Sequence, residues 1–138
     1  MTLRRLVLDT GVLYGLFDAD DVEHHDVCVR GFNALAEGNT RLIVPACVVL
    51  ETAKRMLFDI GVDAMQSAVA GMLNSLEILD TTPQAIESAF ELIQTKAGWR
   101  ATLEDAMVIQ TALALDAPVW TFNYRDFAAV KRLQFWTP

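Results

Sequence analysis

The sequence contains little cysteine and little positive charge. Its two cysteines, Cys28 and Cys47, do not fall in a metal-binding spacing, so we expect buried thiols in a reduced compartment. The 18 acidic residues outnumber the 11 lysines and arginines, which gives a formal net charge of −7. This balance argues against a protein that binds nucleic acid through a broad basic face, but it allows an enzyme that contacts a few phosphates.

Long apolar segments are also missing. The apolar run after Arg4 and Arg5 ends at Asp9, which is too early for the apolar region of a signal peptide. The longest apolar stretch, residues 42–50, is interrupted by Pro45 and is too short to cross a bilayer. We therefore expect a cytoplasmic protein that does not associate with membranes.

The composition that is present is typical of one folded domain. Of the 138 residues, 53% are hydrophobic and 21% are charged, which is enough apolar surface to bury a core. The sequence shows no internal repeat, low-complexity tract or linker. We therefore expect a single domain over residues 1–138.

Short apolar runs alternate with segments of helical periodicity along the chain. The expected strands are residues 3–8, 41–44, 76–79 and 118–121, with 133–136 as a last edge strand. The expected helices are residues 12–17, 22–37, 46–60, 63–74, 82–96 and 102–116, with a loop over 123–126. This pattern predicts an α/β fold in which helices flank a central parallel sheet of four to five strands. Such sheets bind ligands at the carboxyl ends of their strands.

Acidic and amide side chains stand near these predicted strand ends. Asp9 directly follows the first strand, and Asn123 and Asp126 follow the fourth. Glu51 lies in the helix after the second strand, and Asp105 opens the helix before the fourth, on its sheet-facing side. Each residue alone is an ordinary turn, cap or surface residue. Their joint placement is what indicates a site.

Converging carboxylates repel one another, and a hard divalent cation relieves that repulsion. Mg²⁺ and Mn²⁺ prefer oxygen ligands of this kind. A centre built from them activates water for attack on a phosphodiester and neutralises charge on the leaving oxygen. The sequence has no Cys/His cluster, phosphate-binding glycine loop or nucleophile elbow that would indicate another chemistry.

The same residues resemble the motifs of the PIN domain family, in the family's order. The resemblance is carried by Leu8-Asp9-Thr10-Gly11 with residues 20–25, by Val48-Val49-Leu50-Glu51, by Leu103-Glu104-Asp105-Ala106 and by residues 120–127. Within that family, the sequence is most similar to VapC-type ribonuclease toxins of toxin–antitoxin pairs. The resemblance implies a PIN-like three-layer α/β/α fold and an endoribonuclease that depends on Mg²⁺ or Mn²⁺.

Carried over to this sequence, the resemblance gives catalytic, metal-binding roles to Asp9, Glu51 and Asp105. The fourth acidic position is Asn123, where the family most often has Asp. Asp126, three residues later, either supplies the missing carboxylate or caps the turn, which leaves the number of metal ions open. The resemblance also implies an RNA substrate, and it makes a cognate antitoxin protein and a homodimer the assemblies to test.

Three cations are candidates for binding substrate phosphates. Lys54 and Arg55 lie one turn beyond Glu51, and Arg125 lies within the fourth motif. An ion pair with Glu51 is an equally good interpretation of the first two, as is simple solvation for Arg125.

Other functions compete with the nuclease. Asn123 in an acidic position also suits a catalytically weakened PIN-like module that binds RNA or protein. A phospho-accepting receiver domain is disfavoured, because Asp9 has no acidic neighbour and no lysine lies within residues 121–124. A phosphatase of the haloacid dehalogenase type would need a second Asp at the position of Gly11.

Overall fold

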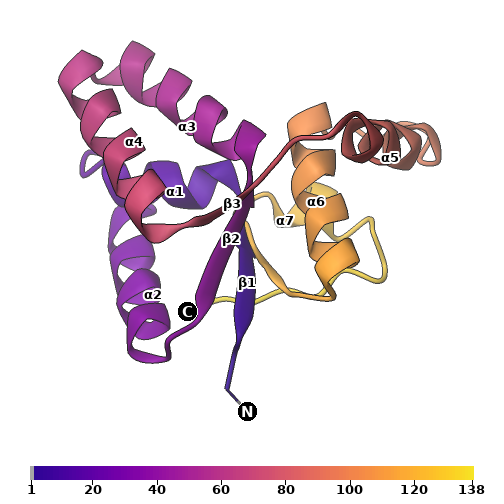
Figure 1. Ribbon diagram of the computed structural model, residues 1–138, viewed down its shortest axis with the longest axis horizontal. Coiled ribbons are helices and arrows are strands. Elements are labelled where there is room, and N and C mark those ends of the chain that lie inside the picture. Colours follow the sequence, from indigo (N-terminus) through magenta and orange to yellow (C-terminus); the bar gives the residue numbers. More distant parts are fainter. Residues whose placement is uncertain (1) are drawn as a thin grey trace.

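The structure is a computed structural model that describes residues 2–138. Figure 1 shows the path of the chain from the amino terminus to the carboxyl terminus. In chain order the elements are β1 (Arg5–Leu8), α1 (Thr10–Phe17), α2 (His25–Glu37), β2 (Arg41–Pro45), α3 (Ala46–Asp59), α4 (Val62–Ser75), β3 (Glu77–Leu79), α5 (Pro83–Gln94), α6 (Leu103–Leu115), β4 (Val119–Trp120) and α7 (Tyr124–Phe127). The alternation of strands and helices predicted from the sequence is confirmed.

The strands form one parallel sheet in the order β3-β2-β1-β4. Figure 1 views this sheet close to edge-on, with α1 to α4 on one side and α5 to α7 on the other, which makes three layers. The chain moves outward from β1 through β2 to β3, and then returns to the opposite side of β1 with β4. The strand order therefore reverses at β1, and ligands of open α/β sheets bind at such a reversal.

The last expected strand is much shorter than residues 133–136. It forms a single parallel bridge, in which Phe135 pairs with Val119. The Val119 N–H donates to the Gln134 carbonyl at 2.9 Å, and the Trp136 N–H donates to the Val119 carbonyl at 3.0 Å. The bridge stays short because β4 itself contains only Val119 and Trp120. The sheet is accordingly four-stranded with one added bridge.

Two local predictions also differ from the structure. The second helix begins at His25 rather than at residue 22, because residues 22–24 form a turn in which Val22 is 87% exposed. Residues 124–127, which largely overlap the expected loop, form the short helix α7 instead. In α7 the N–H groups of Phe127 and Ala128 donate to the carbonyls of Asn123 and Tyr124, which closes one helical turn. Neither segment has an apolar stripe that periodicity could have detected.

The core lies on both faces of the sheet, since Leu6, Val7 and Leu8 of β1 have no exposed surface. Trp120 of β4 is 1% exposed, and its ring packs at 5.2 Å from Phe32 of α2 and at 5.1 Å from Trp136. Along residues 2–138, no helix has the length and apolar character needed to cross a membrane.

Gly31 of α2 provides a test of this packing. A Cβ at residue 31 would overlap the indole ring of Trp120, so Gly31→Ala forces the helix away from the sheet. We expect the free energy of unfolding, measured by urea denaturation, to fall by about 1–3 kcal/mol. Gly71→Ala in α4 is the control, because its Cβ would meet Phe17 only at an ordinary 3.8 Å. That control should be neutral or stabilising by up to about 1 kcal/mol, and an equal loss in both variants would contradict the packing argument.

Candidate functional site

A hollow of about 410 Å³ opens at the carboxyl end of the sheet, next to β1. It collects side chains from the end of β1, the start of α1, α3, the start of α6 and the segment after β4. The lining residues are Asp9, Thr10, Gly11, Glu51, Arg55, Asp105, Phe122 and Asn123. A larger hollow of about 540 Å³ between α5 and α6 has only one carboxylate, Glu91, in its lining. The acidic side chains therefore gather at the reversal of strand order.

Asp9 is the most buried carboxylate of this site, with 7% of the residue exposed. It caps the amino end of α1, where Oδ1 accepts the Thr10 N–H at 2.8 Å, and Oδ2 accepts the Thr121 hydroxyl at 2.7 Å. Burial raises the pKa of Asp9 to about 6, and the charges of Asp105 and Glu51 add to the rise. The two hydrogen bonds oppose this change but do not cancel it. Asp9 is thus rigidly held and is poorly stabilised as an anion.

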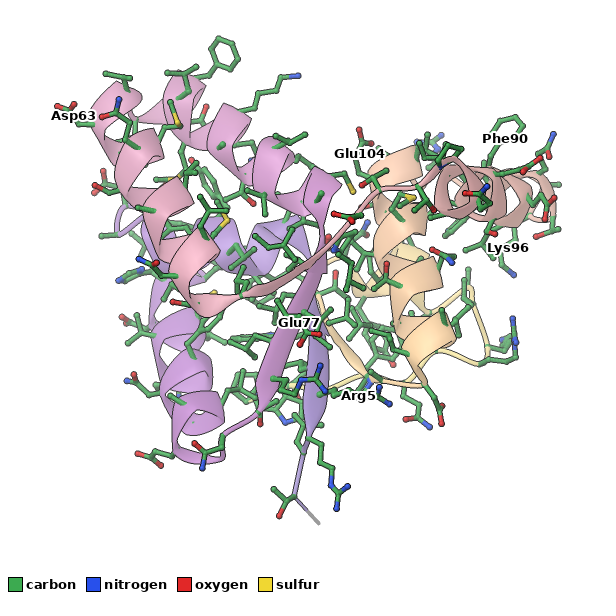
Figure 2. The ribbon with its side chains drawn as sticks, in the orientation of Figure 1. Arg5, Asp63, Glu77, Phe90, Lys96 and Glu104 are labelled. Carbon is green, nitrogen blue, oxygen red and sulfur yellow. The ribbon has the colours of Figure 1, made fainter. Side chains whose placement is uncertain are left out.

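Glu51 faces the same hollow from the second turn of α3. Its Oε2 accepts the Thr10 hydroxyl at 3.2 Å. Burial raises its pKa above the ordinary value, and the nearby carboxylates of Glu104 and Asp105 act in the same direction. Figure 2 shows Glu104 at the amino end of α6, on the side of α3. The Thr10 hydrogen bond and the charge of Arg55 counteract the rise.

Asp105 enters the hollow from the first turn of α6. It completes a capping box, in which its N–H donates to Thr102 Oγ1 and its Oδ2 accepts the Thr102 N–H, both at 3.1 Å. Burial raises its pKa, and the charges of Asp126 and Glu104 add to that effect. One ordinary cap therefore also brings a carboxylate to the hollow.

The chemistry of these groups fits a hard divalent cation. Every acidic group that lines the hollow has a raised pKa, which a bound cation would reverse. All the candidate ligands carry oxygen. Within residues 2–138, no group of three or more His, Cys, Asp or Glu side chains is close enough to hold an ion between them. Mg²⁺ does not require such a cage, because it commonly keeps several waters and uses one or two carboxylates plus a substrate phosphate.

Of the five predicted ligands, the structure brings four to the hollow. Asn123 lines it and is fixed by its own N–H, which donates to Thr121 Oγ1 at 2.9 Å. Asp126 is not in the lining, and its Oδ1 lies 3.8 Å from Arg125 Nε. Its carbonyl accepts Trp99 Nε1–H at 2.9 Å, so α7 is tied to the loop before α6. Asp126 reaches the site only through its charge on Asp105.

The three predicted phosphate-binding cations also separate. All three are exposed, but only Arg55 lines the hollow, whereas Lys54 and Arg125 lie outside its lining. Successive residues of a helix are rotated by about 100°, so Lys54 and Arg55 cannot share a direction. Arg55 lies on the same side of α3 as Glu51, four residues earlier, and this side faces the hollow.

Two threonines were missed by the sequence argument. Thr10 bonds both Asp9 and Glu51, and Thr121 bonds both Asp9 and Asn123. Thr121 directly follows β4, and Thr10 lies two residues after the end of β1, at the edge where the acidic residues were sought. The available signal was one threonine next to Asp9 and another two residues before Asn123, because buried carboxylates need donors.

The chain was compared with known proteins. A family model described as the PIN domain matches residues 6–133. A search of curated proteins finds no match. Among solved structures, Mycobacterium tuberculosis VapC20, a sarcin–ricin loop cleaving toxin, has a TM-score of 0.82 at 20% identity. That alignment covers 96% of this chain and 99% of VapC20.

Two toxin–antitoxin complexes are similar as well. VapBC2 from Rickettsia felis, bound to a promoter DNA fragment, has a TM-score of 0.76 at 20% identity, over 96% of this chain and 97% of the other. DNA-bound VapBC from Salmonella typhimurium has a TM-score of 0.75 at 19% identity, over 97% and 98%. At these identities the likeness concerns the fold, and it extends over nearly the whole of each chain.

Proposed function

The chain belongs to the PIN domain family, and we propose that it is a metal-dependent endoribonuclease that hydrolyses RNA phosphodiester bonds. One observation carries the proposal. Asp9, Glu51, Asp105 and Asn123, which are far apart in the sequence, line one hollow at the reversal of strand order. The raised pKa values of the three carboxyl groups support a cation as the missing partner.

Asp9, Glu51, Asp105 and Asn123 would hold Mg²⁺ or Mn²⁺, with Asp126 as an outer candidate. Such an ion, when bound, polarises the scissile phosphate and lowers the pKa of water. The chain's own groups provide the rest. Thr10 and Thr121 hold the Asp9 carboxylate in one orientation. The Thr10 hydroxyl also holds Glu51 toward the same hollow.

We also propose that the protein is the toxin of a toxin–antitoxin pair. Its structural neighbours include VapBC complexes and a toxin–antitoxin complex from Klebsiella pneumoniae. An apolar groove of about 350 Å³ between α1, α2 and α4 supports a protein partner. Exposed apolar side chains on α3 and α4, among them Leu50 and Phe58 at 71% and 75%, support a second interface such as that of a homodimer.

The alternative function is a weakened PIN-like module that binds RNA or protein without cutting. Asn123 at the fourth acidic position favours it, because the amide brings no charge to the hollow. Calorimetry separates the two functions. Heat of binding with Mg²⁺ or Mn²⁺ at millimolar concentration supports the nuclease, and its absence supports the module.

The nuclease is tested by incubating the purified protein with total RNA. We expect discrete fragments in the presence of Mg²⁺ or Mn²⁺, none in EDTA, and recovery when excess Mn²⁺ is added back. The reason is that the carboxylates alone cannot neutralise the charge that develops on the phosphate. Cleavage that is equally fast in EDTA would contradict the proposal, as would intact RNA under all metal conditions.

A further inference from the structure

Helices α1 and α3 lie side by side and touch through three successive contacts. The first is the hydrogen bond from Thr10 to Glu51 at 3.2 Å. In the second, the guanidinium carbon of Arg55 lies 3.9 Å from the centre of the Tyr14 ring. In the third, the Tyr14 hydroxyl donates to Asp59 Oδ2 at 2.8 Å. Residues 10 and 14, and residues 51, 55 and 59, are four apart, so each set shares one helix face.

Arg55 stacks on this ring instead of forming an ion pair. Glu51 and Asp59, one turn to either side of it, are the partners that helix geometry offers. In the part of the chain that the structure describes, none of the ion pairs contains Arg55. Its N–H groups are therefore free to bind an anion, and they lie at the wall of the acidic hollow.

The Tyr14 ring is a rigid support for that guanidinium. Tyr14 is 7% exposed, and its hydroxyl is held by Asp59. Burial, with the hydrogen bond to Asp59, keeps the pKa of the phenol above its ordinary value, so the hydroxyl stays a donor. A guanidinium held over the face of a fixed ring loses little freedom when it binds a phosphate.

We propose that Tyr14 is a positioning residue, which holds Arg55 against the hollow so that its guanidinium binds a phosphate of the RNA strand next to the one that is cut. The proposal rests on the nuclease function proposed above. It assigns Arg55 to substrate binding, in addition to the effect of its charge on Glu51. Because a neighbouring phosphate is bound equally in the ground state and in the transition state, the effect falls on KM rather than on kcat.

The test uses steady-state kinetics on a short RNA that the wild-type protein cleaves. Arg55→Gln should raise KM about 10-fold, change kcat less than about 2-fold, and reduce the slope of log(kcat/KM) against log[salt] by about one. Tyr14→Leu, which removes the ring, should raise KM about 3-fold to 10-fold. It should raise KM no further in the Arg55→Gln background, because the two residues act through one contact. Tyr14→Phe keeps the ring and should stay within about 2-fold of wild type.

Arg4→Gln is the matched control for lost charge. Arg4 is exposed just before β1, at the opposite end of the sheet from the hollow, as the position of the amino terminus in Figure 1 shows. Its KM and salt slope should equal those of the wild type. Circular dichroism melts check that Tyr14→Leu is folded. Arg55→Lys tests the same contact without touching the core. It keeps the charge and loses the planar guanidinium over the ring, and its KM should rise at least about 3-fold.

Several results would overturn the inference. Additive effects of Tyr14→Leu and Arg55→Gln would do so, as would an unchanged KM in Arg55→Lys. A wild-type protein that cleaves RNA while these variants keep its KM would leave the nuclease standing and remove only the proposed roles of Arg55 and Tyr14. A wild-type protein that leaves RNA intact with Mn²⁺ present would instead remove the nuclease, and with it this inference.

Discussion

Replacing Asp9 with Asn is expected to reduce RNA cleavage by more than about 100-fold while the protein stays folded. The substitution preserves shape, and the new amide keeps both contacts. Its oxygen accepts the Thr10 N–H, and its NH₂ donates to Thr121 Oγ1. What is lost is the negative charge at the centre of the hollow, which the proposed metal centre needs. Cleavage is measured as initial rate on a labelled RNA with Mn²⁺ present.

Asp116→Asn is the matched control for this loss of charge. Asp116 ends α6 in the left-handed conformation, with φ of 50°, at the opposite end of the helix from Asp105. Asn tolerates that conformation as well as Asp does. The control should cleave at the wild-type rate. Wild-type cleavage by Asp9→Asn would contradict the metal site at Asp9, whereas equal losses in both variants would indicate a general effect of charge.

The second large effect concerns stability and pH. The pKa of Asp9 rises from 3.8 to about 6 on folding, mainly because the carboxyl group is buried. The protonated group therefore favours the folded state, and this contribution is complete below pH 3.8 and is lost as the pH rises through about 6. The loss amounts to about 3 kcal/mol by pH 8, since each pKa unit corresponds to about 1.4 kcal/mol.

Urea denaturation of wild type and Asp9→Asn over pH 4 to 8 measures this contribution as the difference between their free energies of unfolding. Because Asn does not titrate, the variant should gain on the wild type as the pH rises, and it should be the more stable protein at pH 8. Mg²⁺ or Mn²⁺ at pH 8 should restore the wild type and leave the variant unchanged, since binding to the folded state stabilises it by mass action. A difference in the free energy of unfolding that stays constant with pH would contradict a buried carboxyl group with a raised pKa at this position.

Several features of the fold could be read from local patterns. Short apolar runs located the strands and period-3.6 spacing located most helices, because burial of a strand on both faces, or of a helix on one face, imposes these patterns directly on the chain. The reduction of the fifth strand to a single bridge and the presence of α7 could not be found this way. Both depend on what lies next to them. Residues 133–136 can pair only as far as the two-residue β4 extends, and α7 is held through the contact of Trp99 with Asp126.

The candidate site divides in the same way. The rule that parallel strands present their carboxyl ends at one edge was enough to select Asp9, Glu51, Asp105 and Asn123 from sequence. The rule could not show that Asp126 lies outside the hollow, because the position of its side chain depends on the helical turn of α7. Nor could it separate Lys54 from Arg55. Which side of α3 faces the hollow depends on how α3 packs against the neighbouring elements.

By itself, the sequence determined the order of elements, the parallel sheet and the acidic residues at the carboxyl ends of its strands. These follow from spacing along the chain and from residue type. Only the tertiary structure decided which groups touch. The contact of Tyr14 with Arg55 depends on the register of α1 against α3, and the bond of Thr121 to Asp9 spans 112 residues. Such contacts depend on how distant segments pack together, and local sequence propensities do not determine that packing.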